Sequence, residues 1–183
     1  MTYKYTMKHT SLLFFAIILF NCNNNTSKQT AEVTPIQDSE SLTTTIFLIR
    51  HAEKDLSTSN NPDLTKEGEI RAQNWSDYFS TIKFDAIYTS NFTRTKKTAQ
   101  PTASKNNLEP EIYNPERISA QSFLEQNKGK TVLMVGHSNT IPFFVNDIIG
   151  KKVYEEIDET VYNHLYKITI SKGQINHNLT TVD

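Results

Sequence analysis

Short apolar runs alternate with amphipathic stretches along the chain from residue 44 onward. The runs over 44–50, 85–89 and 131–136 are rich in aliphatic and β-branched residues and lack regular polar alternation, which is typical of strands buried on both faces. Polar turn residues and a longer amphipathic stretch follow each run. This order predicts an α/β domain whose central sheet is mainly parallel.

The stretch after the first run shows the clearest helical pattern. Thr65 is a predicted N-cap, because a threonine side chain accepts a hydrogen bond from a free N–H of the first turn. Ala72, Trp75 and Phe79 then recur at helical spacing and form a stripe that faces the core. Further helices are predicted over 94–105 (with Pro101), 119–126 and 139–149 (with Pro142 in its first turn), and a short strand over 112–113.

The C-terminal residues carry a different pattern. Residues 164–171 alternate polar and apolar positions, and Lys172-Gly173 separates them from the stretch 174–179. Two such stretches around a two-residue turn predict a β-hairpin, which adds antiparallel strands to one edge of the sheet. We therefore expect residues 44–183 to form one three-layer αβα sandwich, with a mostly parallel central sheet and an antiparallel edge.

The first residues predict export. Lys4 and Lys8 precede the uncharged apolar run 12–20, as in a signal peptide, and this run is too short to span a bilayer as a helix. We therefore expect residues 1–21 to be a signal peptide. Met7 is an alternative start, because counting from it gives a more compact signal.

Cys22 is the only cysteine, so no intrachain disulfide can form. Its position after the apolar run resembles the lipid-attachment cysteine of bacterial lipoproteins, although Phe20-Asn21 replaces the small residues usual before it. We expect Cys22 to be lipidated and residues 22–43 to be a flexible tether, which anchors the domain to a bacterial membrane on the exported side, periplasmic or cell-surface. An incidental thiol and an uncleaved anchor are the alternatives.

The net charge of −1 gives no reason to expect nucleic acid or an anionic membrane surface as a partner. Any positive potential must be local, which fits a small anionic ligand. The ends of the predicted strands supply such a potential: Arg50-His51 follow the first run, Arg94 begins the helix after the second, and His137 follows the third. In a parallel sheet these ends share one edge, where ligands bind.

Two histidines and two arginines at one edge are suited to holding a phosphate and attacking it. His51 is the candidate nucleophile, because a neutral imidazole nitrogen can attack phosphorus and form a phosphohistidine. Arg50 and Arg94 would bind the phosphoryl oxygens, and their charge disfavours the imidazolium form. His137 is expected to donate a further hydrogen bond, and Lys54 is either an additional positive charge or an ordinary solvated side chain. Metal binding by the histidines is the alternative, which the two arginines disfavour.

Four segments resemble motifs of the histidine phosphatase superfamily, also called phosphoglycerate mutase-like. Residues 48–54 are similar to its Arg-His-Gly signature, with Ala52 in place of glycine. Residues 63–68 resemble its Leu-Thr-x-x-Gly element, which opens the first helix. Residues 88–99 resemble the segment that supplies its second arginine, and residues 135–140 its second-histidine motif.

The resemblance, which extends over about residues 44–149, implies a phosphomonoester hydrolase with His51 as the phosphorylated nucleophile. It implies that Arg50, Arg94 and His137 complete the phosphate pocket, that no metal or organic cofactor takes part, and that the substrate is a phosphorylated small molecule or a phosphoprotein. A mutase-type phosphotransferase and a non-catalytic phosphate-binding module are the alternatives. Hydrolysis is favoured over the mutase, because the stretch between Arg94 and His137 is short and leaves little material for a lid that excludes water.

The identity of the general acid stays open. Glu116-Arg117 resembles a Glu-Arg pair of the mutase branch, and Glu53 and Glu125 are rival candidates. Ser138 follows the second histidine and excludes the branch that has aspartate at that place. The sequence therefore predicts a phosphate site without assigning the group that protonates the leaving group.

Overall fold

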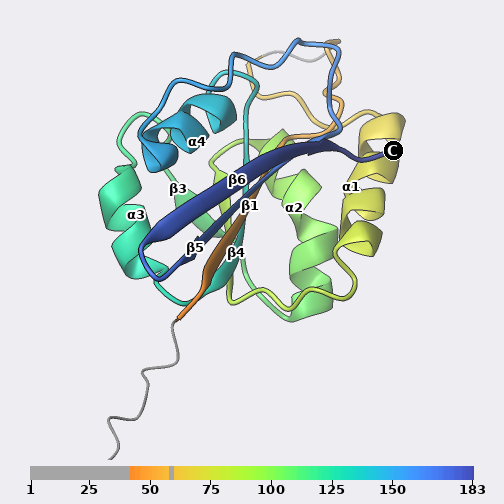
Figure 1. Ribbon diagram of the computed structural model, residues 1–183. Helices are drawn as coiled ribbons and strands as arrows, with labels where there is room; N and C mark the ends of the chain where they lie inside the picture. Colours follow the sequence, from red (N-terminus) through yellow and green to blue (C-terminus); the bar gives the residue numbers. More distant parts are fainter. Residues whose placement is uncertain (1–41, 58–59) are drawn as a thin grey trace, which may run out of the picture. The chain divides into compact units, whose positions relative to one another are not determined.

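Six strands and four helices occupy residues 42–57 and 60–183, the part of the chain that the computed structural model describes (Figure 1). The strands are β1 (Thr44–Arg50), β2 (Ala86–Ser90), β3 (Glu111–Tyr113), β4 (Thr131–Gly136), β5 (His164–Ser171) and β6 (Gln174–Thr181). The helices are α1 (Lys66–Tyr78), α2 (Thr93–Asn106), α3 (Ala120–Gln126) and α4 (Ile141–Ile149). Each predicted element is present, with small shifts at the ends.

All six strands join one sheet in the order β3-β2-β4-β1-β5-β6. β1, β2, β3 and β4 run parallel to their neighbours in this group, whereas β5 and β6 are antiparallel. Lys172 and Gly173 join β5 to β6 with φ angles of 51° and 75°, as a two-residue hairpin turn with positive φ at both central residues requires. The predicted mixed sheet, mainly parallel with an antiparallel edge, is confirmed.

The sheet is covered on both faces, which gives three layers (Figure 1). Ile46 and Leu48 of β1 pack into the cluster that includes apolar residues of α3 and α4. Phe47 and Ile49, which alternate with them, pack into the cluster that includes Trp75 of α1 and residues of α2. Because successive strand residues point to opposite faces, one continuous apolar run serves both layers.

The helix after β4 begins later than the sequence predicts, at Ile141 rather than at residue 139. Pro142 lies at its first turn, where the missing N–H is harmless. Residues 137–140 form a turn instead, in which the N–H groups of Thr140 and Ile141 donate to the carbonyl of His137 at 3.3 and 3.1 Å. The strand and the helix are therefore separated by a turn that carries the second histidine.

The predicted signal peptide over 1–21, the lipidated Cys22 and most of the tether over 22–43 lie outside the described residues. Within 42–57 and 60–183, none of the helices has the length and apolar character needed to cross a membrane.

Candidate active site

The C-terminal ends of β1 and β4 bring the two predicted histidines together. Arg50 pairs in register with Gly136, and the backbone N–H of His51 donates to the carbonyl of Gly136 at 2.9 Å. The rings of His51 and His137 then lie 5.4 Å apart between centroids. Arg94, in the first turn of α2, places its Nη2 atom 3.4 Å from His137 Nδ1. The structure thus gathers all four predicted site residues at one edge of the sheet.

His51 is buried and held in one tautomer. Its Nδ1 lies 2.7 Å from the carbonyl oxygen of Ala52, and because a carbonyl only accepts, Nδ1 carries the proton and Nε2 keeps its lone pair. Burial lowers the pKa of His51 to about 3, and the charges of His137, Arg94 and Arg50 act in the same direction. The ring is therefore neutral near pH 7, with one nitrogen available to attack an electrophile.

Arg50 is fixed by the loop between α4 and β5. Its side chain is 1% exposed, and Nη1 donates to the carbonyls of Asp158 and Val161, each at 2.9 Å. The guanidinium lies over the ring of Tyr162, 4.3 Å from its centroid. Nη2 makes an ion pair of 2.9 Å with Glu159 Oε2, but neither Nε nor Nη2 has a hydrogen-bond partner among the described residues. The Nε–Nη2 edge of this buried guanidinium therefore has an ion pair with Glu159 but no hydrogen bond in the described structure.

Arg94 and His137 form the other wall. The Arg94 guanidinium lies over the ring of Phe92, 4.4 Å from its centroid, and its buried Nε also lacks a hydrogen-bond partner in the described part of the chain. His137 Nε2 is 2.8 Å from Ser90 Oγ at the end of β2. Burial lowers the pKa of His137 to about 4, helped by the positive charge of Arg94. Two buried arginine edges and a neutral histidine therefore surround His51.

Ala52, where the family signature has glycine, is accommodated by packing. Its methyl group is fully buried in a small cluster with Leu64 and Ala72. Its backbone N–H donates to Thr98 Oγ1 at 2.9 Å, and that hydroxyl donates to the carbonyl of Arg94 at 2.7 Å. The substitution keeps the turn after His51 and ties it to the helix that carries the second arginine.

Two glycines of the motifs lie where a Cβ atom would approach a neighbour closely. A Cβ atom on Gly68 would lie 2.3 Å from the carbonyl oxygen of Glu53, because the start of α1 packs on that backbone. A Cβ atom on Gly136 would lie 2.5 Å from the hydroxyl oxygen of Tyr113. Thr65 caps the helix that contains Gly68, whose N–H donates to Thr65 Oγ1 at 3.1 Å, as predicted.

A cavity of about 820 Å³ opens beside the arginine and histidine wall. Its lining residues are Asn91, Phe92, Arg94, Ile112, Tyr113, Asn114, Pro115, Glu116, His137, Asn139 and Thr140. Of the three glutamates considered as general acid, Glu116 lines this cavity. Glu53 instead forms an ion pair with Arg71, at 2.7 Å, and Glu125 accepts a hydrogen bond from the neighbouring Gln121 on α3.

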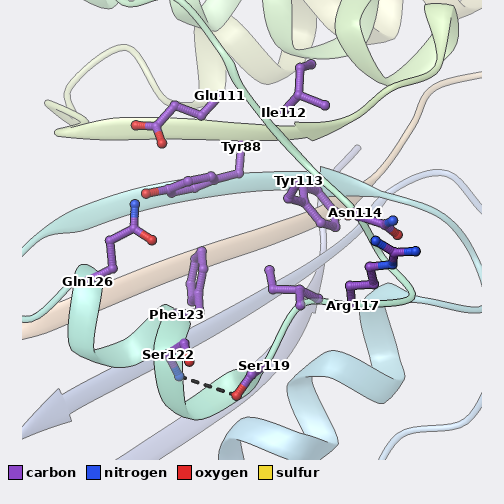
Figure 2. A pocket seen from close by; sticks show the side chains of 11 residues that line it. Tyr88, Glu111, Ile112, Tyr113, Asn114, Arg117, Ser119, Ser122, Phe123 and Gln126 are labelled. Carbon is purple, nitrogen blue, oxygen red and sulfur yellow. Dashed lines mark hydrogen bonds between the residues drawn. The ribbon is translucent and has the colours of Figure 1, made fainter.

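A second cavity, of about 370 Å³, lies next to the first and is shown in Figure 2. Tyr88, Phe123 and Tyr113 line it with their rings, and Arg117 lines the end near Asn114. Tyr113 and Asn114 line both cavities. The leaving group of a ligand bound at Arg94 would therefore meet a wall that is partly aromatic and partly polar.

Glu159 is a site residue that the sequence did not reveal. Its Oε1 accepts from Ser138 Oγ at 2.7 Å and its Oε2 from Lys54 Nζ at 3.0 Å. These two hydrogen bonds, followed by the charge of Arg50, lower the pKa of Glu159 to about 2. It lies in a loop without helix or strand that runs over the edge at which β1 ends (Figure 1). Such a loop has no hydrophobic periodicity from which the position of a side chain can be predicted. Lys54, for which the sequence left two interpretations open, faces the site.

No group of three or more His, Cys, Asp and Glu side chains in residues 42–57 and 60–183 is arranged to hold a metal ion. The two histidines are instead accompanied by arginines, which are ligands for anions.

Residues 46–115 match the histidine phosphatase superfamily, branch 1. The match contains three of the four motif segments, 48–54, 63–68 and 88–99, and it confirms the resemblance there. No curated protein matches the chain. The segment around His137 lies outside the matched residues.

Solved structures of two phosphatases, one of them putative, and of a mutase share the fold. The protein histidine phosphatase SixA complexed with tungstate is 17% identical, with a TM-score of 0.60 over 75% of this chain and 96% of that one. A putative alpha-ribazole-5'-P phosphatase from Escherichia coli K-12 is 16% identical, with a TM-score of 0.63 over 76% and 96%. Phosphoglycerate mutase from Bacillus anthracis is 14% identical, with a TM-score of 0.58 over 78% and 93%. These likenesses establish a phosphoglycerate mutase-like fold.

Proposed function

We propose that the protein is a phosphomonoester hydrolase of the histidine phosphatase superfamily, with His51 as the nucleophile. One observation carries this proposal. The buried ring of His51, with Nε2 unprotonated, is within the influence of the Arg50 and Arg94 charges, and both guanidiniums carry buried donors that have no hydrogen-bond partner in the described structure. Buried donors of this kind are rare unless a ligand satisfies them, and guanidinium edges match phosphoryl oxygens.

The reaction follows from these positions in two steps. His51 Nε2 attacks phosphorus and forms an N–P bond, while the bond from phosphorus to the leaving oxygen breaks with its electron pair. Arg50 and Arg94 stabilise the charge on the phosphoryl oxygens. Water then attacks the phosphohistidine, and inorganic phosphate leaves with His51 neutral again. In the free protein Ser90 Oγ donates to Thr95 Oγ1, so His137 Nε2 donates to Ser90 Oγ and its Nδ1 accepts from Arg94 Nη2, which orients this guanidinium toward the phosphoryl oxygens.

We assign the general acid to Glu116, on the support that it lines the same cavity as Arg94 and His137. Its carboxyl proton would pass to the leaving oxygen. The Glu116→Gln change should therefore slow hydrolysis of an alkyl phosphate, a poor leaving group, far more than hydrolysis of p-nitrophenyl phosphate. Glu125→Gln on α3 is the matched control. Equal effects on both substrates would remove Glu116 from this role.

Hydrolysis is favoured over a mutase reaction by the segment between Arg94 and His137. Most of it is taken up by α2, β3, α3 and β4, which leaves only short connections from which a lid could form. Water therefore keeps access to a phosphorylated intermediate. A phosphorylated small molecule or a phosphoprotein would fit this open cavity.

The test is to trap the intermediate. A base quench after mixing the protein with a labelled phosphomonoester should leave label on the chain, and brief acid should remove it, because an N–P bond is labile in acid. His51→Ala should lose both the label and the release of p-nitrophenol from p-nitrophenyl phosphate. Phosphate binding without turnover in the unaltered protein would favour the non-catalytic module. Activity that persists in His51→Ala, or that EDTA abolishes and zinc restores, would point to a metallophosphatase.

We further propose that the mature protein begins at Cys22 and is anchored by lipid on the exported side. The support is the apolar run that ends before Cys22 and the polar stretch after it. Stable anchoring requires more than one acyl chain, so the mass of the mature chain should include several. A Cys22→Ser protein that stays in the membrane fraction with unchanged modification would contradict this proposal.

A further inference from the structure

Glu159 places a carboxylate against three donors at the edge of the phosphate site. Arg50 Nη2 lies 2.9 Å from Oε2, Lys54 Nζ lies 3.0 Å from the same oxygen, and Ser138 Oγ lies 2.7 Å from Oε1. The donors come from the end of β1, the loop that follows it, and the turn after β4. A carboxylate with donors on both oxygens occupies the kind of cradle that a phosphoryl group also fits.

Arg50 is held by other contacts, whereas the Glu159 carboxylate is exposed to solvent. The Arg50 side chain is 1% exposed, whereas the Glu159 side chain is 59% exposed. Nη1 of Arg50 is held by two backbone carbonyls of the loop, so Arg50 stays in place if the glutamate side chain turns into solvent. The Arg50 contact is an ion pair without a hydrogen bond, and ion pairs with a solvated partner are weak.

We propose that Glu159 is a resident counter-ion that the phosphoryl group of the substrate displaces. Lys54 Nζ, Ser138 Oγ and the Nε–Nη2 edge of Arg50 then bind the phosphoryl oxygens. This inference rests on the proposed function, because it takes the cradle to be part of the phosphate site. A phosphoryl dianion carries twice the charge of the carboxylate, so the exchange is favourable next to Arg50, Arg94 and Lys54.

The substrate therefore binds by replacing one anion with another. In the free protein the carboxylate neutralises part of the positive charge at the sheet edge. In the complex the released carboxylate is solvated, while the backbone of the loop continues to hold Arg50. Removing the negative charge of Glu159 should for this reason strengthen phosphate binding.

The experiment measures binding of inorganic phosphate by calorimetry at pH 7, which needs no turnover. Glu159→Gln should bind phosphate about two- to thirtyfold more tightly, the range expected when two weak ion pairs no longer compete. Glu156→Gln, an equal charge change at an exposed position of the same loop, should bind as the unaltered protein does. In the Glu159→Gln background the carboxylate no longer engages Lys54 and Ser138, so both residues contribute to phosphate binding alone. Lys54→Met and Ser138→Ala should therefore each weaken phosphate binding in that background.

Weaker or unchanged phosphate binding in Glu159→Gln, relative to Glu156→Gln, would overturn the inference and make Glu159 a support for Arg50. Unchanged binding on removal of Lys54 or Ser138 in that background would also overturn it. These results are separable from the proposed function. A protein that binds phosphate more tightly without Glu159, yet releases no p-nitrophenol, would retain the exchange and lose the hydrolase.

Discussion

The buried, neutral His51 should make the fold sensitive to mild acid. Its pKa is about 3 in the folded protein, against 6.5 for an unperturbed histidine. Below pH 6.5 the unfolded chain therefore binds a proton at this position that the folded chain does not, so the free energy of unfolding falls as the pH falls. The contribution of neutral His51 is fully present above pH 6.5 and is lost progressively between pH 6.5 and 3.

The size of the effect follows from the same two values. Between pH 6.5 and 5, His51 alone should lower the free energy of unfolding by about 1.6 kcal/mol. His137, with a pKa of about 4, should contribute nearly the same amount. The shifted carboxylates lie below their ordinary values of 3.8 and 4.5, so their stabilising effect is lost mainly at lower pH. The interval from pH 6.5 to 5 thus isolates the histidines.

Urea unfolding at pH 6.5 and pH 5 gives the measurement. The His51→Gln protein should lose about 1.6 kcal/mol less between the two pH values than the unaltered protein. The comparison is unaffected by any constant cost of the substitution, because only the difference between pH values is used. Equal losses in the unaltered and His51→Gln proteins would refute the assignment of a buried neutral imidazole.

Two further substitutions test the motifs. Arg94→Ala should lower kcat/KM for p-nitrophenyl phosphate by the equivalent of about 2–4 kcal/mol, because a preorganised charge at the phosphoryl oxygens is lost. An unchanged kcat/KM would exclude Arg94 from the site. Gly68→Ala should destabilise the fold by about 1–3 kcal/mol in urea unfolding, because the new methyl meets the carbonyl of Glu53 and this overlap outweighs the better helix propensity of alanine. A stabilised Gly68→Ala protein would show that the contact relaxes.

The parts of the fold predicted from sequence are those for which burial leaves a pattern. β1 and β4 have the predicted bounds, because strands covered on both faces read as continuous apolar runs. The C-terminal hairpin was predicted from alternation and from a turn that requires positive φ. The histidines and arginines were found because strand ends meet at one edge. The predicted helix after β4 begins two residues too early, because the polar residues of the hydrogen-bonded turn are equally compatible with the first turn of a helix.

Residues whose role depends on long-range contacts left no such pattern. Glu159 lies 109 residues after Arg50 and 105 residues after Lys54, its ion-pair partners. Neither its carboxylate nor the Lys54 ammonium differs in local sequence from a solvated side chain. The proposed general acid could likewise be chosen among Glu53, Glu116 and Glu125 only from the structure. The choice depends on which of these residues lines the cavity and which have partners elsewhere. The sequence indicated the chemistry of the site, but it did not show the positions of the proposed general acid, Glu116, and the proposed counter-ion, Glu159.

The hydroxyl of Thr98 limits how the cavity can widen on the side of α2. Because it accepts from the N–H after His51 and donates to the carbonyl of Arg94, one oxygen atom fixes the distance between the nucleophile and the second arginine. A tilt of α2 that widened the cavity for a bulkier substrate would stretch this link and shift the imidazole with it. Variants that accept larger substrates should therefore arise by remodelling the opposite wall, around Ile112 and Asn114, where no such tether joins the lining to the nucleophile among the contacts described.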